Sequence, residues 1–168
     1  MEKKRLTIVG DAAVGKSSLI RSFMKIIMNA EYIPPVIIDD YSLVLEVRGD
    51  TKLLLINDTL SSRYWSKLKG LIYPETDAVM IVFDITSTDS LSNVTDHWFP
   101  EVSSYCPNVP IILVGNKKDL RKGDDDKVDY TERKAKAKRI GARDYIECSA
   151  ITMEGIPGFA RRNNNNFI

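Results

Sequence analysis

Residues 10–17 read Gly-Asp-Ala-Ala-Val-Gly-Lys-Ser, which matches the pattern G-x-x-x-x-G-K-[ST]. The β-branched run Leu6–Val9 comes directly before this stretch, and a helical pattern over residues 16–27 begins inside it. Such a loop curls its backbone N–H groups around phosphate oxygens, and the helix N-terminus adds a positive dipole. Lys16 would reach the outer phosphates, and the Ser17 hydroxyl would ligate Mg²⁺. We therefore predict a phosphate-binding loop; the alternative is a strand-to-helix turn that carries Lys-Ser by chance.

On both sides of this loop, short β-branched runs alternate with helical stretches, which predicts an α/β fold: a six-stranded, mostly parallel sheet with helices on both faces. Two runs, 78–83 and 111–114, are apolar throughout, as is typical of central parallel strands. A turn at Gly49-Asp50 predicts a hairpin that supplies one antiparallel edge. The predicted strands are 6–9, 43–47, 53–56, 78–83, 111–114 and 145–146, and the predicted helices are 16–27, 62–72, 90–105 and 131–140, the last with Thr131 as its N-cap.

The composition fits one globular domain. The chain has 168 residues, of which 43% are hydrophobic, and 24 Lys+Arg against 23 Asp+Glu give a net charge of +1. We place the domain at residues 1–160 and a disordered Asn-rich tail at 161–168. Because the charge is balanced, no nucleic-acid partner is expected. Separately, we predict a monomer. Two cysteines and no signal peptide predict free thiols and a cytoplasmic location, and the C-terminus does not support attachment to a membrane by prenylation.

A second motif, Asn116-Lys117-Lys118-Asp119, directly follows the apolar run 111–114 and Gly115. In open α/β sheets, ligands bind beyond the carboxyl ends of the strands, so this motif would face the same crevice as the phosphate loop. A carboxylate accepts two N–H groups from guanine, whereas adenine presents an acceptor there, so Asp119 would select guanine. Ser149-Ala150 follows the last predicted strand and would approach the same base. Alone, the motif is also compatible with a solvated charged loop; Asn116 and Asp119 disfavour an adenine-nucleotide kinase with a phosphate loop.

With these motifs in this order, the chain resembles small GTPases of the Rho/Rac family, within the Ras superfamily. The resemblance spans about residues 4–155 and is densest over 106–121, with support from 73–77 and 147–150. It implies a phosphate-loop NTPase fold, GTP or GDP with Mg²⁺ as ligands, and a signalling switch that acts on actin-directed effectors and meets regulators of the Rho type. The nucleotide-binding residues that it implies are Ala12, Ala13, Val14, Gly15, Lys16, Ser17, Ser18, Met28, Asn116, Lys117, Asp119, Ser149 and Ala150, and Asp58 joins Ser17 at the metal.

The first switch of the family departs from its pattern in this chain. Where the family has Tyr-x-Pro-Thr, with the threonine at Mg²⁺ and the γ-phosphate, this chain has Tyr-Ile-Pro-Pro at residues 32–35. Pro35 has neither a hydroxyl nor an N–H, so it cannot make either contact. A carboxylate from Asp39 or Asp40 would bring negative charge close to the phosphates. The effector and switch positions that the resemblance implies are Tyr32, Pro34, Pro35, Val36, Asp39, Asp40, Tyr41, Ser61 and Ser62.

The second switch departs as well. The family's Asp-Thr-Ala-Gly-Gln is Asp-Thr-Leu-Ser-Ser at residues 58–62. Ser62, in the glutamine position, is too short to orient the attacking water, and Ala12 adds a methyl group where the family has glycine beside the γ-phosphate. Met28 replaces the aromatic residue over guanine, and Pro157 predicts a truncated or broken C-terminal helix.

No catalytic residue is therefore intact, and the sequence predicts guanine-nucleotide binding with weak or absent GTP hydrolysis. Two alternatives stay open. One is a pseudo-GTPase interaction module that does not cycle. The other is an ordinary active Rho-family switch.

Overall fold

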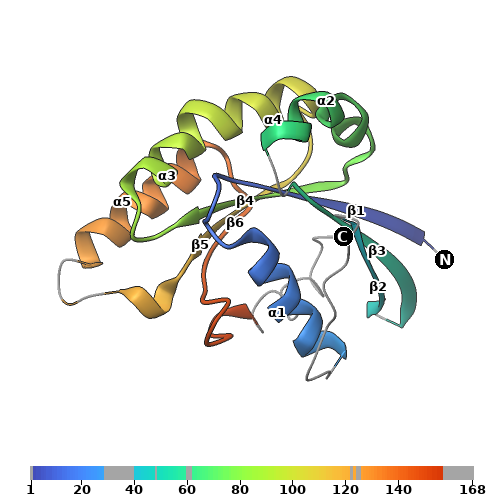
Figure 1. Ribbon diagram of the computed structural model, residues 1–168, viewed down its shortest axis with the longest axis horizontal. Helices are drawn as coiled ribbons and strands as arrows, with labels where there is room; N and C mark the ends of the chain where they lie inside the picture. The colour runs from blue at the N-terminus through green and yellow to red at the C-terminus, as the bar shows by residue number, and fades with distance from the viewer. Residues whose placement is uncertain are drawn as a thin grey trace.

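The computed structural model describes residues 2–28, 40–47, 49–59, 62–121, 123 and 126–156. It has one six-stranded sheet with helices on both faces, in the order β2-β3-β1-β4-β5-β6 (Figure 1). Only the β2–β3 pair is antiparallel; the other four pairs are parallel. The predicted α/β fold is therefore confirmed. The strands are β1 (Glu2–Val9), β2 (Asp40–Val47), β3 (Asp50–Asp58), β4 (Ala78–Asp84), β5 (Ile111–Asn116) and β6 (Asp144–Glu147).

The hairpin of β2 and β3 supplies the predicted antiparallel edge. Val47 pairs with Asp50, so Asp50 already belongs to β3 and the predicted turn at Gly49-Asp50 was placed one residue too late. Gly49 has a φ of +83°, a left-handed conformation that glycine adopts without the steric cost of a Cβ. The turn therefore depends on that glycine.

The sheet separates two hydrophobic cores. Every residue of β4 and β5 is buried, as the apolar runs predicted, because helices cover both faces of these strands. In Figure 1, α1 (Lys16–Met28) lies against one face, and α2 (Ser62–Ile72), α3 (Thr88–Asn93), α4 (Phe99–Tyr105) and α5 (Asp126–Arg139) lie against the other. On the α1 side, Leu19 and Ile20 pack among the buried residues of the sheet. Trp65 and Tyr73 are among those that form the core on the opposite side.

Two predicted helices differ from the structure. The stretch 90–105 is not one α-helix, because the π-helical turn η2 (Val94–Trp98) separates α3 from α4. The helix predicted from Thr131 begins at Asp126, so the assignment of Thr131 as N-cap was wrong. The charged stretch before Thr131 shows no apolar periodicity by which the start could be recognised. The short 3₁₀ turns η1 (Tyr73–Glu75) and η3 (Lys118–Leu120) follow α2 and β5.

The described helices are all too short or too polar to cross a membrane. Both cysteines, Cys106 and Cys148, are buried free thiols. The predicted break of the C-terminal helix at Pro157 and the predicted tail at 161–168 lie outside the described residues.

Candidate functional site

The loop of residues 10–17 connects β1 to α1 at the carboxyl end of β1. Its two glycines have positive φ angles, +151° at Gly10 and +93° at Gly15. A Cβ on Gly10 would lie 2.2 Å from the carbonyl oxygen of Val82, and a Cβ on Gly15 would lie 2.5 Å from Nδ2 of Asn116. Ala13 also adopts a left-handed φ, +64°. These positions let successive backbone N–H groups curve into a concave surface of the kind that binds anions.

Lys16 lies inside this loop and is only 7% exposed. Its Nζ donates to the carbonyl oxygens of Gly10 at 2.8 Å and Asp11 at 2.9 Å, which uses two of the three ammonium protons. Burial lowers the pKa of Lys16, and the charges of Asp58 and Asp11 act in the opposite direction. The loop therefore holds a cation whose third proton can be donated to a phosphate oxygen.

Asn116, the last residue of β5, joins the three predicted loops. Its side chain is buried, and Nδ2 donates to the carbonyl oxygen of Val14 in the phosphate loop at 2.9 Å. Its Oδ1 accepts from the backbone N–H of Ala150 at 3.1 Å. One amide thus contacts two segments that are far apart in the sequence, as expected at the carboxyl ends of parallel strands.

Asp119 is exposed on η3, and one of its two carboxylate oxygens is held by a hydrogen bond. Oδ1 accepts from the hydroxyl of the fully buried Ser149 at 2.7 Å, and that hydroxyl also accepts from the N–H of Thr152 at 3.0 Å. A carboxylate accepts up to about four hydrogen bonds. Asp119 therefore retains acceptor capacity toward solvent, which is what recognition of two N–H groups on a guanine edge requires.

Ser17 and Asp58 are the candidate metal ligands. Ser17 is the second residue of α1, and Asp58 ends β3 with 4% exposure. The negative charge of Asp58 favours the charged form of Lys16. The Asp58 carboxylate, at the end of β3, is therefore close enough to the phosphate loop to interact electrostatically with its lysine. Mg²⁺ is usually bound by one or two carboxylates, hydroxyls and substrate phosphates. This donor set of hard oxygen atoms fits Mg²⁺.

Asp11 also belongs to this site, although the phosphate-loop pattern assigns no role to its side chain. Its carboxylate accepts from Asn93 Nδ2 and from Trp98 Nε1, both at 2.7 Å, which connects the phosphate loop to α3 and η2. Positions five apart are separated by about 140° around an α-helix. The wider π-helical turn brings Asn93 and Trp98 toward one face, so both reach the same carboxylate. The sequence carries no short motif for this contact.

A cavity of about 380 Å³ lies between the phosphate loop, α2 and the α3–α4 segment. On its far side, Glu101 accepts from Trp65 Nε1 at 2.8 Å, from the Tyr73 hydroxyl at 2.8 Å and from Lys69 Nζ at 3.0 Å. Burial raises the pKa of Glu101, but these three donors outweigh it and hold the pKa below its usual value. The contacts fix α2 against α4. The cavity is lined by Gly10, Asp11, Ala12, Lys16, Thr59, Trp65, Ser66, Lys69, His97, Trp98 and Glu101.

Several predicted positions are placed differently or lie outside the described residues. Tyr41, predicted for the switch surface, is 4% exposed and packs in the core on the α1 side, because it points inward from β2. The structure does not describe Tyr32, Pro34, Pro35, Val36, Asp39 or Ser61, nor the side chains of Met28, Asp40 and Ser62.

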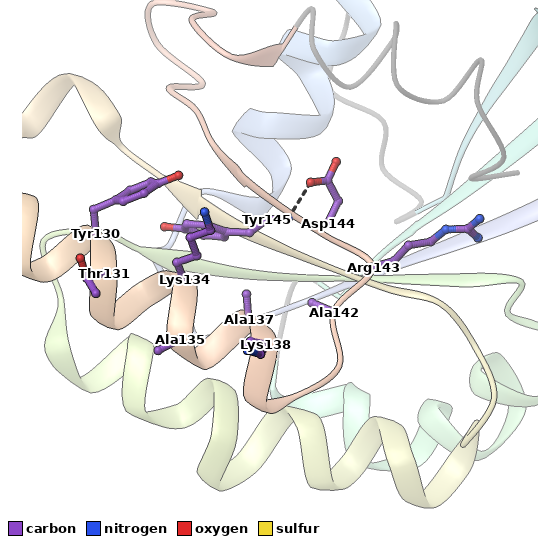
Figure 2. A pocket seen from close by; sticks show the side chains of 10 residues that line it. All are labelled: Tyr130, Thr131, Lys134, Ala135, Ala137, Lys138, Ala142, Arg143, Asp144 and Tyr145. Atoms are coloured by element: carbon purple, nitrogen blue, oxygen red, sulfur yellow. Dashed lines mark hydrogen bonds between the residues drawn. The ribbon is translucent and has the colours of Figure 1, made fainter.

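A separate groove of about 630 Å³ lies between α5 and β6, and none of the predicted binding residues lines it. Figure 2 shows that its cationic side chains do not converge, because Lys134 and Lys138 come from α5 whereas Arg143 points away from that helix. Asp144 Oδ1 accepts from the Tyr145 N–H at 2.9 Å. The functional candidate is therefore the loop cluster at the carboxyl ends of β1, β3 and β5.

The comparison with protein families agrees with this geometry. The model of the Ras family matches residues 5–160, which covers the sheet except for the first three residues of β1, together with the phosphate loop, the loop after β5 and the loop after β6. The chain therefore belongs to the Ras family and is a GTP-binding small GTPase.

Proposed function

We propose that this protein is a Rho-like guanine-nucleotide-binding protein that holds GTP or GDP with Mg²⁺ and hydrolyses GTP weakly or not at all. The observation that carries the proposal is the junction at Asn116. Its amide contacts the phosphate loop at Val14 and the third loop at Ala150, while Asp119 is held by Ser149. This arrangement fixes a phosphate-binding surface and a base-selecting carboxylate relative to each other, as recognition of a whole nucleotide requires.

The residues divide into three roles. The amides of residues 12–18 and the ammonium group of Lys16 hold the phosphates, and Asp119 accepts from the guanine edge. Ser17 and Asp58 hold Mg²⁺, which neutralises phosphate charge when it is bound. The burial of Lys16 strengthens its attraction to an anion, since the local dielectric is lower than that of water.

Weak hydrolysis is proposed from the sequence of the two switches. Pro35 offers no donor to a γ-phosphate, Ser62 is too short to orient water, and Ala12 adds a methyl group beside the transferred phosphate. By the same resemblance, we propose partners of the Rho effector and regulator type and signalling toward actin.

A second candidate is an interaction module that binds nucleotide without cycling. The observation that favours it is the position of α2, which Trp65 and Lys69 hold against Glu101 of α4, while Tyr73 of η1 donates to the same carboxylate. Because α2 directly follows the second switch in the chain, an α2 that is fixed in this way would respond little to the γ-phosphate.

The test begins with the full chain purified without added nucleotide. The protein is denatured, the released nucleotide is identified by ion-exchange chromatography, and GTP conversion by a loaded sample is followed for hours. We expect bound guanine nucleotide and little conversion. Complete conversion within minutes would establish an ordinary active switch, and the absence of nucleotide at every Mg²⁺ concentration would contradict both forms of the proposal.

Two variants make the test sharper. The double substitution Ser61→Gly and Ser62→Gln restores the family residues and should raise the hydrolysis rate, whereas Ser92→Gln on the exposed side of α3 should not. Asp119→Asn should relax the preference for guanine, and the exposed Asp89→Asn should leave it unchanged.

A further inference from the structure

Asp84 ends β4 and carries a nearly buried carboxylate that no motif identifies. Its side chain is 11% exposed, and Oδ2 lies 2.7 Å from Nζ of Lys117. Oδ1 accepts from the N–H of Thr86 at 2.8 Å and from its hydroxyl at 2.7 Å. Burial raises the pKa of Asp84, but the hydrogen bonds from Lys117 and Thr86 outweigh it, so the pKa is lower than usual. The carboxylate is therefore ionised at neutral pH and has a partner for each oxygen.

Lys117 needs such a partner because its backbone is strained. It has φ +67° and ψ 35°, a left-handed conformation that is sterically unfavourable for a residue with a Cβ. Lys117 lies between Asn116 and η3, so this turn sets the direction in which the chain reaches Asp119. Around it, the N–H of Lys118 donates to the carbonyl oxygen of Cys148 at 3.0 Å.

The backbone of β4 places Asp84 beside this turn. Asp84 pairs with Asn116 in the β4–β5 register, and the N–H of Ile85 donates to the Asn116 carbonyl oxygen at 3.1 Å. The strand pairing thus places Asp84 opposite Asn116, the residue that directly precedes Lys117. Each of the four motif residues then has its own contact: Asn116 with Val14 and Ala150, Lys117 with Asp84, Lys118 with Glu154, and Asp119 with Ser149.

We infer that Asp84 is a positioning residue of the base-recognition loop: it holds the ammonium group of Lys117 and thereby maintains the turn that presents Asp119 to a guanine base. The inference rests on the proposed guanine-nucleotide binding. Asp84 does not contact the nucleotide in this account. It slows nucleotide release through Lys117.

A merely structural role for Asp84 is the competing explanation, because the same carboxylate also accepts from Thr86 in the turn after β4. The two roles use different oxygens. Asp84→Asn keeps an oxygen acceptor for Thr86 and removes the charge that holds Lys117. Lys117→Met removes the ammonium group and keeps a stem of similar length. Thr86→Val removes the hydroxyl donor and leaves the ion pair intact.

The experiment measures the dissociation rate of a fluorescent GDP analogue from each full-length variant, after a chase with excess GDP. We expect Asp84→Asn and Lys117→Met each to accelerate release about tenfold, since each removes a charge-assisted hydrogen bond. The double variant should release no faster than the faster single variant. Thr86→Val should stay within about twofold of the wild-type rate.

The matched control is Asp77→Asn, at the other end of the same strand. Asp77 precedes β4, accepts from the N–H of Arg5 at 2.7 Å and lies 3.7 Å from Lys4 Nζ, so this change also removes one paired charge next to β4. Because Asp77 is remote from the loop cluster, release should remain within about twofold of wild type. A melting curve for each variant separates a change in release rate from a loss of folding.

The outcomes are distinct. If wild type retains nucleotide and Asp84→Asn releases it at the wild-type rate, the inference fails while the proposed function stands. If the two substitutions multiply to about a hundredfold in the double variant, Asp84 acts independently of Lys117 and the inference is again overturned. If wild type binds no guanine nucleotide, the proposed function is contradicted, and the inference about Asp84 that rests on it is contradicted as well. Should Asp84→Asn not fold, Lys117→Met tests the same contact from its other side, and a wild-type release rate there would overturn the inference.

Discussion

Replacing Glu101 by glutamine tests how firmly α2 is fixed against α4. The Glu101 side chain is 9% exposed and accepts from Trp65, Lys69 and Tyr73. In the variant, one amide oxygen can still accept from Trp65 and Tyr73. The amide nitrogen would face the Lys69 ammonium, so the substitution removes that charge-assisted contact. The hydrogen bonds from Trp65 and Tyr73 remain, but they are weaker because their acceptor is no longer charged.

The magnitude follows from this geometry. A hydrogen bond to a charged group contributes about 1.5–3 kcal/mol, and the Lys69 side chain, at 26% exposure, places its contact at the lower end. We expect Glu101→Gln to lower the free energy of unfolding by about 1–2 kcal/mol. In a domain of this size, that change corresponds to a fall in Tm of about 2–8 °C.

The pH dependence gives a second observable. Because the pKa of Glu101 is below its usual value in the folded state, its stabilising contribution is present above the unfolded-state pKa of about 4.3. The contribution is lost as pH falls through the lower folded-state pKa. The difference in stability between wild type and Glu101→Gln should therefore shrink between about pH 6 and pH 3.

Urea unfolding followed by tryptophan fluorescence measures both quantities. Glu75→Gln is the control, because Glu75 is 60% exposed in its pair with Arg5 and should change stability by less than about 0.5 kcal/mol. A Glu101→Gln variant as stable as wild type at pH 7, or a difference that does not change with pH, would refute this account of the α2–α4 contact.

Three further predictions concern the loops and the buried groups. Gly15→Ala should weaken GDP binding at least about tenfold in calorimetry, because the new Cβ would displace the Asn116 amide, whereas Gly70→Ala, with nothing within 4 Å of its Cβ, should not. Arg133→Met should lower stability by about 3 kcal/mol in urea, since Arg133 is 2% exposed and pairs with Glu147 at 3.0 Å; the exposed Lys134→Met is its control. Burial raises the pKa of the Cys148 thiol to about 12 and of Cys106 to about 11, so neither should react with a disulfide reagent at pH 8 until urea is added. Rapid reaction of folded protein would contradict the third prediction.

The sheet could be predicted from the sequence because its signals are local. The apolar runs 78–83 and 111–114 lie within β4 and β5, and the turn glycine marks the hairpin within one residue. The candidate site was found for the same reason: residues 10–17 and 116–119 are short contiguous motifs, and the parallel topology brings their ends together.

What could not be predicted depends on partners that are distant in the sequence. Asp11 and Trp98 are 87 positions apart, and their contact depends on a π-helical turn that leaves the helical pattern of 90–105 almost unchanged. Asp84 acquires its role from the β4–β5 register. The early start of α5 at Asp126 was missed because the charged sequence there has no apolar periodicity to mark it.

The central claim is tested most directly by calorimetric titration of folded, nucleotide-free protein with GDP and, separately, with ADP in the presence of Mg²⁺. The account predicts a saturable one-site heat with GDP and none with ADP, because Asp119 accepts from guanine and meets an acceptor on adenine. Equal heats for the two nucleotides, or no heat with GDP from a sample shown to be folded, would contradict it.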